Sequence, residues 1–250
     1  IWGFRVGGLF GSDEEAAEYA SKVDMSKVCK DYYGSVGITG VRGGDMKYLD
    51  LNEDGELSFG QGTLEDHGDR VVIGNSQPRF LYGFHGGFDY RGIDFSVFFQ
   101  GIGHQDWYPG SDNMRFWGPY CRPYVSFVGK DFMSNVWSED NKDAYFPRPR
   151  GYSALNPGAL YYTNDRYLQN LAYLRLKNLT LGYTLPEKLT MKAKISKLRV
   201  YFSGENLWYT SPVKKHNKYV DPELLAIASN KNGDTYSFYK TFSFGVTVTF

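Results

Sequence analysis

Carboxylate and amide side chains with the spacing of a calcium-binding loop are the clearest candidates for chemistry in this sequence. Asp50, Asn52 and Asp54 occupy positions 1, 3 and 5 of such a loop. Gly55 follows at the position where the chain must turn sharply, and Glu56 would supply a backbone carbonyl at the next. Ca²⁺ takes about six to eight oxygen ligands. The loop therefore predicts a structural Ca²⁺ site, with a solvated turn stabilised by its Asp and Asn side chains as the alternative.

No other cluster of catalytic or metal-binding residues stands out. The twelfth position of the calcium-type loop is Gln61, a neutral and poor bidentate ligand. The four histidines form no zinc-binding pair: they are His67, His85, His104 and His216. The sequence has neither a Gly-x-Ser-x-Gly nucleophile motif nor a phosphate-binding glycine loop, and no carboxylate pair marks a glycosidase site. We therefore expect a protein that is not an enzyme.

Composition excludes some classes of protein and favours strands. The 250 residues carry 28 Lys and Arg against 28 Asp and Glu, which gives no support to nucleic-acid binding. Aromatic residues make up 18% of the chain, and 29 residues are glycine, as in proteins built of strands and turns. No run approaches the roughly 18 apolar residues of a membrane helix, so strands would have to cross any membrane. Because the chain begins at Ile1, we interpret it as a piece of a longer protein or a processed form.

Six stretches of the chain alternate between apolar and small or polar residues, the period of a strand with one apolar face. The last is the clearest, since Phe242, Phe244, Val246, Val248 and Phe250 all fall on one side. The six predicted strands lie near residues 1–11, 79–90, 93–102, 171–185, 198–209 and 238–250. Arg91-Gly92 fits a two-residue hairpin between the second and third strands. In the fourth, the apolar parity switches near Lys177-Asn178, which predicts a β-bulge.

The lengths of the connections alternate along the chain. The long connections are residues 12–78, 103–170 and 210–237, and those between them are short. In an up-and-down sheet all long connections then lie at one end, which is typical of outer-membrane β-barrels. Six strands are too few to close a barrel and would leave two bare edges. The predicted fold is therefore all-β: six antiparallel transmembrane strands of a larger barrel, with long extracellular loops that contain one or two short helices.

Two of the expected features lie within these loops. The segment Ser12 to Lys30 is Ala-rich and helix-like, with Asp13 as its predicted N-cap. The loop 103–170 is rich in aromatic residues, namely Trp107, Tyr108, Trp117, Tyr120 and Tyr124. These rings could stack on sugars or pack against a partner, but burial within the loop itself is the interpretation we adopt.

Several motifs resemble the SusC/RagA family of TonB-linked outer-membrane transporters. The most specific is the run from Tyr173 to Pro186, YLRLKNLTLGYTLP. It is followed by LRVY at residues 198–201, GENL at 204–207, DPE at 221–223 and the closing strand at 241–250. Upstream, the chain has GD at 44–45, DLNEDG at 50–55, DR at 69–70, IGN at 73–75 and Pro78, in the family's order. The resemblance covers most of the chain, and residues 103–150 are the main part without a match.

The resemblance implies a larger protein and several partners. A family member has a barrel of about 22 strands with an N-terminal plug, so this chain would be the C-terminal part of the barrel. It would import glycans or peptides together with a SusD-like surface lipoprotein. TonB would contact the missing N-terminal part, and outer-membrane lipid would surround the strands. The implied location is the outer membrane of a Gram-negative bacterium, with extracellular loops and a periplasmic C-terminus.

The resemblance also suggests which residue completes the calcium loop. The family pattern has an acidic residue directly before an Arg, which corresponds here to Asp69 before Arg70. Several inserted residues separate it from the rest of the loop, so Asp66 and Glu65 are alternatives. The predicted ligands are therefore Asp50, Asn52, Asp54, Glu56 and Asp69.

Two other classes of protein remain as alternatives to the transporter. A secreted, calcium-stabilised β-sandwich that binds carbohydrate would share the alternation, the aromatics and the calcium loop, but its two sheets would have to cover one core. An enzyme of glycan breakdown would need the acid and base carboxylates that this sequence does not mark.

Overall fold

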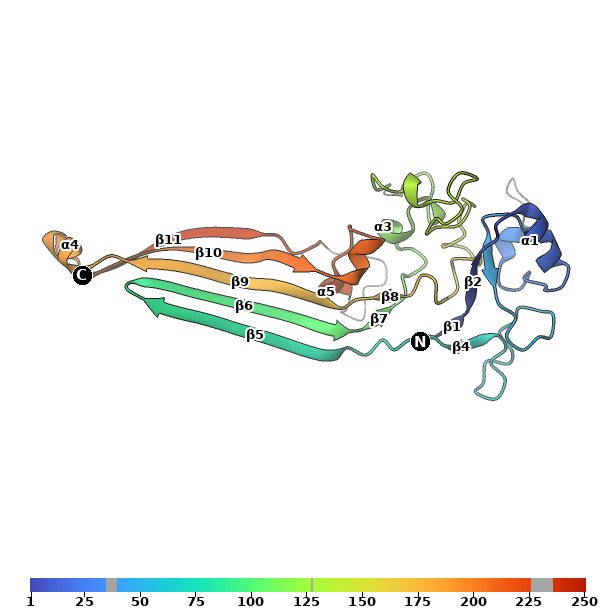
Figure 1. The fold of residues 1–250 in the computed structure, drawn as a ribbon, viewed down its shortest axis with the longest axis horizontal. Helices are drawn as coiled ribbons and strands as arrows, with labels where there is room; N and C mark the ends of the chain where they lie inside the picture. Colours follow the sequence, from blue (N-terminus) through green and yellow to red (C-terminus); the bar gives the residue numbers. More distant parts are fainter. Residues whose placement is uncertain (35–39, 127, 226–235) are drawn as a thin grey trace.

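A computed structural model describes residues 1–34, 40–126, 128–225 and 236–250 of the chain. A long five-stranded sheet extends from a packed region of short strands, helices and turns (Figure 1). The strands of the sheet are β5 (Arg79–Tyr90), β6 (Ile93–His104), β9 (Tyr173–Thr184), β10 (Lys197–Thr210) and β11 (Thr241–Thr249). They lie in the order β11-β10-β9-β6-β5, and every neighbouring pair is antiparallel. The sheet is therefore an up-and-down meander, with β5 and β11 as its edges.

Local signals in the sequence explain the hairpin and the irregularity of this sheet. Arg91 and Gly92 join β5 to β6 with positive φ angles of 49° and 83°, as a tight two-residue hairpin requires. On β9, Asn178 pairs with Phe98 and Leu176 pairs with Phe99, so Lys177 is an inserted residue. The β-bulge that the switch in apolar parity predicts is therefore present at Lys177.

The two faces of the sheet differ sharply in chemistry. One row of paired residues across all five strands is wholly aliphatic or aromatic: Phe88, Phe95, Leu181, Phe202 and Phe244. The neighbouring row, on the other face, is small or polar: Gly87, Ser96, Thr180, Ser203 and Ser243. Three of these apolar side chains are exposed, with Phe88 55%, Leu181 48% and Phe244 83% exposed, and Phe95 and Phe202 are half-buried. We call these the apolar face and the polar face.

The connections are distributed as the alternating lengths predict. The connections 105–172 and 211–240 leave from the same end of the sheet, which we call the loop end. The hairpin at Arg91-Gly92 and the connection 185–196 lie at the other end, the turn end, as does the C-terminus (Figure 1). Two short helices occupy the 185–196 connection, α4 (Glu187–Thr190) and the 3₁₀ helix η3 (Met191–Ala193).

The prediction of a sixth sheet strand at residues 1–11 is wrong for this structure. That stretch forms β1 (Trp2–Phe4), which pairs with β4 (Arg70–Val72), and β2 (Val6–Leu9), which pairs with β3 (Met46–Tyr48). Both pairs lie outside the five-stranded sheet. The physical reason is that the apolar positions of this stretch face a core, since Phe4 and Phe10 are almost fully buried. Gly3 also lies so close to the backbone that a Cβ would be 2.7 Å from the Thr163 carbonyl oxygen.

The predicted loops 12–78 and 103–170 are folded segments that pack together. Their buried side chains, with Phe4, Phe10 and several residues of 213–225, form one hydrophobic core beyond the loop end of the sheet. The segments contain α1 (Asp13–Ala20), α2 (Lys30–Tyr33), α3 (Met114–Trp117) and the 3₁₀ helices η1 (Gly118–Tyr120) and η2 (Met133–Asn135). The connection 211–240 adds η4 (Pro212–Lys215) and α5 (Pro222–Leu225), and β7 (Asp106–Trp107) pairs with β8 (Gln169–Asn170). The expectation of one or two short helices is thus too low, because a packed core requires local turns that satisfy buried backbone groups.

Several details of these segments differ from the sequence-based expectations. Helix α1 is capped by Ser12, whose hydroxyl accepts from the Glu15 amide, and it ends at Ala20 rather than near Lys30. Cys29 and Cys121 are free, buried thiols. Parts of the three predicted loops, residues 35–39, 127 and 226–235, lie outside the described residues. Within the described ranges, no helix combines the length and apolar character that a membrane-spanning helix needs.

Candidate functional site

A cluster of four charged side chains, two of them buried, lies on the polar face at the loop end of the sheet. Arg175 of β9 shares the polar face with Gln100 and Tyr209, the residues with which it pairs on β6 and β10. Its side chain is only 1% exposed. A buried guanidinium needs charged or hydrogen-bonding partners, because leaving it unpaired in a low-dielectric environment costs several kcal/mol.

Two carboxylates from the connection 211–240 compensate the charge of Arg175. The Nη2 atom of Arg175 lies 2.5 Å from Oδ1 of Asp221, which is itself 2% exposed. The Nε atom lies 2.8 Å from Oε2 of Glu223, in an ion pair that is not a hydrogen bond. The guanidinium also lies over the rings of Tyr209 and Phe238, 4.6 and 5.1 Å from their centroids.

The β-bulge brings a second cation into the same cluster. Lys177, the inserted residue, places Nζ 2.9 Å from Oε1 of Glu223 and 4.6 Å from the centroid of Phe238. Arg175, Lys177, Asp221 and Glu223 together carry no net charge, and we call them the charge cluster. Because Asp221 and Glu223 flank the start of α5, the cluster fastens this helix to the polar face of β9.

A second ion pair crosses the polar face nearer the turn end. Arg199 of β10 donates from Nε and Nη2 to the two carboxylate oxygens of Asp94 on β6, at 2.8 and 2.5 Å. The pair spans the strand between them, β9, directly over Gly182. A Cβ at this glycine would lie within 2.6 Å of Arg199 Nη2 and against the Asp94 carboxylate. The missing side chain of Gly182 therefore makes room for the pair.

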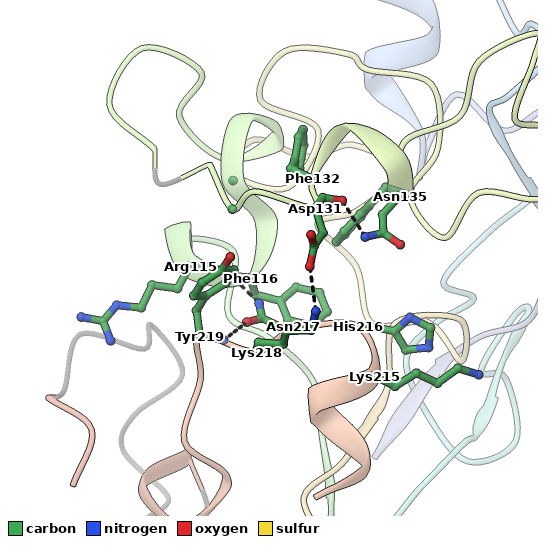
Figure 2. Close-up of a pocket in the computed structure, with 13 residues that line it drawn as sticks. Arg115, Phe116, Asp131, Phe132, Asn135, Lys215, His216, Asn217, Lys218 and Tyr219 are labelled. Carbon is green, nitrogen blue, oxygen red and sulfur yellow. Dashed lines mark hydrogen bonds and ion pairs between the residues drawn. The ribbon is translucent and has the colours of Figure 1, made fainter. Parts of the chain in front are cut away.

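Two adjoining hollows lie between the folded segments at the loop end. The first has a volume of about 270 Å³ and is lined by residues of 115–118, 129–135 and 215–219 (Figure 2). The second, of about 360 Å³, is lined by residues of 134–145 together with Arg166 and His216. Asn135 and His216 line both hollows, and we call the two together the groove.

An ion pair and a ring stack connect the walls of the groove. Lys218 and Asp131 form an ion pair of 2.7 Å between the segments on either side, visible as a dashed line in Figure 2. The imidazole of His216 stacks on Tyr145 with ring centroids 3.8 Å apart and an angle of 8° between the planes. Burial lowers the pKa of His216, and the positive charges of Lys215 and Arg166 lower it further. His216 is therefore a flat ring that lines both hollows and whose charged form is disfavoured.

The calcium-type loop is folded as a compact turn. Asp50 accepts hydrogen bonds from the amides of Glu53 and Gly55, at 2.8 Å each. Asn52 and Asp54 likewise accept from amides two residues further along the chain. Gly55 has the positive φ, 84°, that the sharp turn needs. The loop is therefore preformed by its own side chains.

Asp69, the predicted closing ligand, does lie against this loop. Its two carboxylate oxygens accept from the amides of Leu51 and Ser58, both at 2.7 Å, and so hold the two ends of the loop together. Burial raises the pKa of Asp69, while these hydrogen bonds oppose the rise. The Glu56 side chain pairs with Lys27. Among the described residues no group of three or more His, Cys, Asp or Glu side chains is arranged to hold a metal, and the Ca²⁺ site stays a prediction.

The aromatic residues of 103–170 are mostly buried in the common core. Trp117 and Tyr120 are at most 1% exposed, and Trp107 is 8% exposed. The Tyr108 hydroxyl donates to backbone carbonyls and accepts from Asn164. Tyr124, by contrast, is 69% exposed. The interpretation that these rings pack within the loop is therefore confirmed for most of them.

Sequence reasoning missed both the charge cluster and the groove. Arg175 and Lys177 lie in the YLRLKNLTLGYTLP motif and Asp221 and Glu223 in the DPE motif, but Arg175 and Asp221 are 46 residues apart. The charged residues on the polar face of β9 could have indicated the cluster, because a charged side chain that becomes buried requires a partner in the fold. The groove gives no local signal, because its walls come from segments that lie up to a hundred residues apart.

The sequence is similar to curated TonB-dependent receptors. No family model matches the sequence. The chain is 28% identical over 218 residues to TonB-dependent receptor P26 of Formosa agariphila, covering 83% of this chain and 20% of the receptor. It is 31% identical over 165 residues to TonB-dependent receptor P3 of the same organism, covering 66% of this chain and 14% of that receptor. The chain thus spans a fifth or less of the length of these curated relatives.

The fold also resembles solved structures. The RagAB peptide importer in the open-open state matches over 100% of this chain and 22% of the importer chain, with a TM-score of 0.57 and 19% identity. A second RagAB peptide transporter structure matches 89% of this chain with a TM-score of 0.53, also at 19% identity. These relatives are named as receptors and transporters rather than enzymes. Both comparisons confirm the resemblance that the sequence motifs indicate.

Proposed function

We propose that this chain, which resembles TonB-dependent receptors of the SusC/RagA type in sequence and fold, is the C-terminal part of an outer-membrane importer. Its five-stranded sheet forms part of the barrel wall, in a complete barrel of about 22 strands. Its folded segments at the loop end form part of the vestibule through which a nutrient enters. The role of this part is passive, because it binds and guides rather than transforms what passes.

The observation that carries the proposal is the exposed apolar face of the sheet. The row Phe88, Phe95, Leu181, Phe202 and Phe244 continues across five strands, and no second sheet covers it among the described residues. In water, such a continuous apolar surface would drive aggregation. In a bilayer, the same surface contacts lipid while the polar face lines an aqueous interior. A carbohydrate-binding β-sandwich would instead bury this face in a core.

The direction of the chain across the membrane follows from the two ends of the sheet. Outer-membrane barrels have short periplasmic turns and longer extracellular loops. The loop end, with its packed domain, is therefore extracellular in this proposal, and the turn end and C-terminus are periplasmic.

The proposed partners follow from the relatives. RagAB is named as a peptide importer, and its chain matches this one in fold. We therefore propose that a SusD-like lipoprotein docks on the extracellular segments and that a glycan or peptide is imported. TonB acts through the part of the protein that precedes this chain.

Site-directed spin labels on the full-length protein in lipid vesicles test the proposal. A label at Phe244→Cys should be accessible to oxygen, which dissolves in lipid, and protected from a water-soluble nickel complex. A label at Ser243→Cys, on the adjacent residue and the polar face, should be accessible to the nickel complex and protected from oxygen. A single pattern at both positions, or a full-length protein that stays monomeric without detergent, would refute the barrel. Loss of uptake in cells without TonB tests the import itself.

A further inference from the structure

Two cations that line the groove have no carboxylate partner among the residues that the structure describes. Lys215 and Arg166 form no ion pair with any residue that the structure describes. Lys218, the other lysine of this wall, is neutralised by Asp131. Lys215 is exposed, and Arg166 uses Nε and Nη2 to donate to the carbonyls of Ala144 and Tyr145. These hydrogen bonds fix the guanidinium in place without neutralising it.

Lys215 lines the first hollow, Arg166 lines the second, and His216, the residue after Lys215, lines both. The charges of the two cations act together on the His216 imidazole, lowering its pKa after the larger effect of burial. Figure 2 shows the side chains of Lys215 and His216 extending to the same side. Asp143 also lines the second hollow, but it forms no ion pair with either cation in the described part of the chain. The groove therefore has the charge and donors to hold an anionic group.

The shape and chemistry of the walls favour a sugar over a peptide. The His216 ring stacks on Tyr145 and offers a flat surface where a sugar ring can lie. Ser134, Asn135 and Asn141 add a hydroxyl and two amides to the second hollow. The first hollow adds aromatic side chains, namely Phe116, Phe132, Phe146 and Tyr219. No named strand lines the groove in the described part of the chain, so it presents no strand edge to a peptide backbone.

We propose that the groove binds an acidic oligosaccharide, with its carboxylate or sulfate group between Lys215 and Arg166 and an adjacent ring on His216. This inference rests on the proposed function, since it names the class of nutrient that the vestibule would receive. The volumes of the two hollows, about 270 and 360 Å³, suit a chain of a few sugar units rather than a single ion. Arg166 and Lys215 would discriminate acidic from neutral sugars, and the stacked ring would hold the chain.

Calorimetry on the purified full-length protein tests the proposal without requiring transport. The probes are tetragalacturonate, a sulfated carrageenan tetrasaccharide, the neutral maltotetraose and the peptide tetraglutamate. We expect at least one acidic sugar to bind at least tenfold more tightly than maltotetraose and tetraglutamate. Lys215→Gln should weaken that binding about tenfold or more, the effect of one lost charge-assisted hydrogen bond.

Matched variants separate binding from folding. Arg166→Gln should act like Lys215→Gln, whereas Arg166→Lys keeps the charge and should retain most of the binding. Lys192→Gln, on η3 at the opposite end of the sheet, should have no effect. The proposal is overturned if tetraglutamate binds as well as the acidic sugars, if maltotetraose does, if no probe binds at millimolar concentration, or if Lys215→Gln changes nothing. Binding without uptake would refute the importer and leave the groove as a sugar site.

Discussion

Replacing Arg175 by Met is the most direct test of how the connection 211–240 is held on the sheet. The variant keeps an unbranched side chain as long as the aliphatic part of Arg but removes the guanidinium. Asp221, which is 2% exposed, would then retain the Glu223 amide as a donor but lose its cation. Glu223 would retain Lys177. The substitution thus resembles the removal of one partner from a buried ion pair, which lowers stability by about 3–5 kcal/mol.

The lower end of this range, about 3 kcal/mol, applies because Glu223 and Asp221 each keep one partner. It corresponds to an increase of about a hundredfold in the population of the opened segment. Hydrogen exchange followed by mass spectrometry on the full-length protein measures this opening. Peptides that cover Val213 to Leu225 should exchange about a hundred times faster in Arg175→Met. Peptides from β5, far from the cluster, should keep their wild-type rates.

A nearby exposed ion pair provides the matched control. Lys218 and Asp131 are 65% and 55% exposed, so Lys218→Met should cost at most about 1 kcal/mol and accelerate exchange less than about tenfold. Adding Asp221→Asn to Arg175→Met should restore part of the protection, because no uncompensated charge then remains on Asp221. If Arg175→Met and Lys218→Met accelerate exchange equally, the charge cluster does not fasten the connection and the reasoning fails.

Three further variants test other parts of the structure. Gly182→Val should lower the free energy of unfolding by about 1–3 kcal/mol, because the valine side chain would separate Asp94 from Arg199. Thermal unfolding in detergent measures this change. An unchanged unfolding midpoint would contradict the inferred crowding at Gly182. Burial raises the pKa of Asp31 to about 7, so the folded state binds a proton that the unfolded state has lost, and stability falls as pH rises from about 4 to 7. In urea unfolding, Asp31→Asn should therefore be more stable than the wild type at pH 8 by up to about 4 kcal/mol and should lose this pH dependence. A variant that is less stable than the wild type at every pH would contradict the inferred cost of the buried carboxylate. For the Ca²⁺ site, we expect binding with a dissociation constant of about 0.1–1 mM, as in extracellular modules, abolished by Asp50→Ala; the absence of any divalent metal in calorimetry or bound-ion analysis at millimolar calcium would refute it.

The local alternation of the sequence determined most of the sheet. Strands of the five-stranded sheet could be recognised because side chains on a strand alternate between faces, and this period is visible in ten residues. The hairpin at Arg91-Gly92 and the bulge at Lys177 were likewise readable, since a turn type and a switch in parity are both local properties. The compact turn at Asp50 follows from its own side chains and neighbouring amides.

Tertiary structure alone decided where the first eleven residues lie and what the long connections form. Residues 1–11 alternate as a strand does, but whether the buried face meets a sheet or a core depends on partners such as Thr163, far along the chain. The pairing of Arg175 with Asp221 joins residues 46 positions apart. The groove exists only because segments 129–135 and 215–219 meet. Periodicity encodes the direction in which a side chain points, whereas its partner is set by the path of the whole chain, and so these sites could not be read from the sequence.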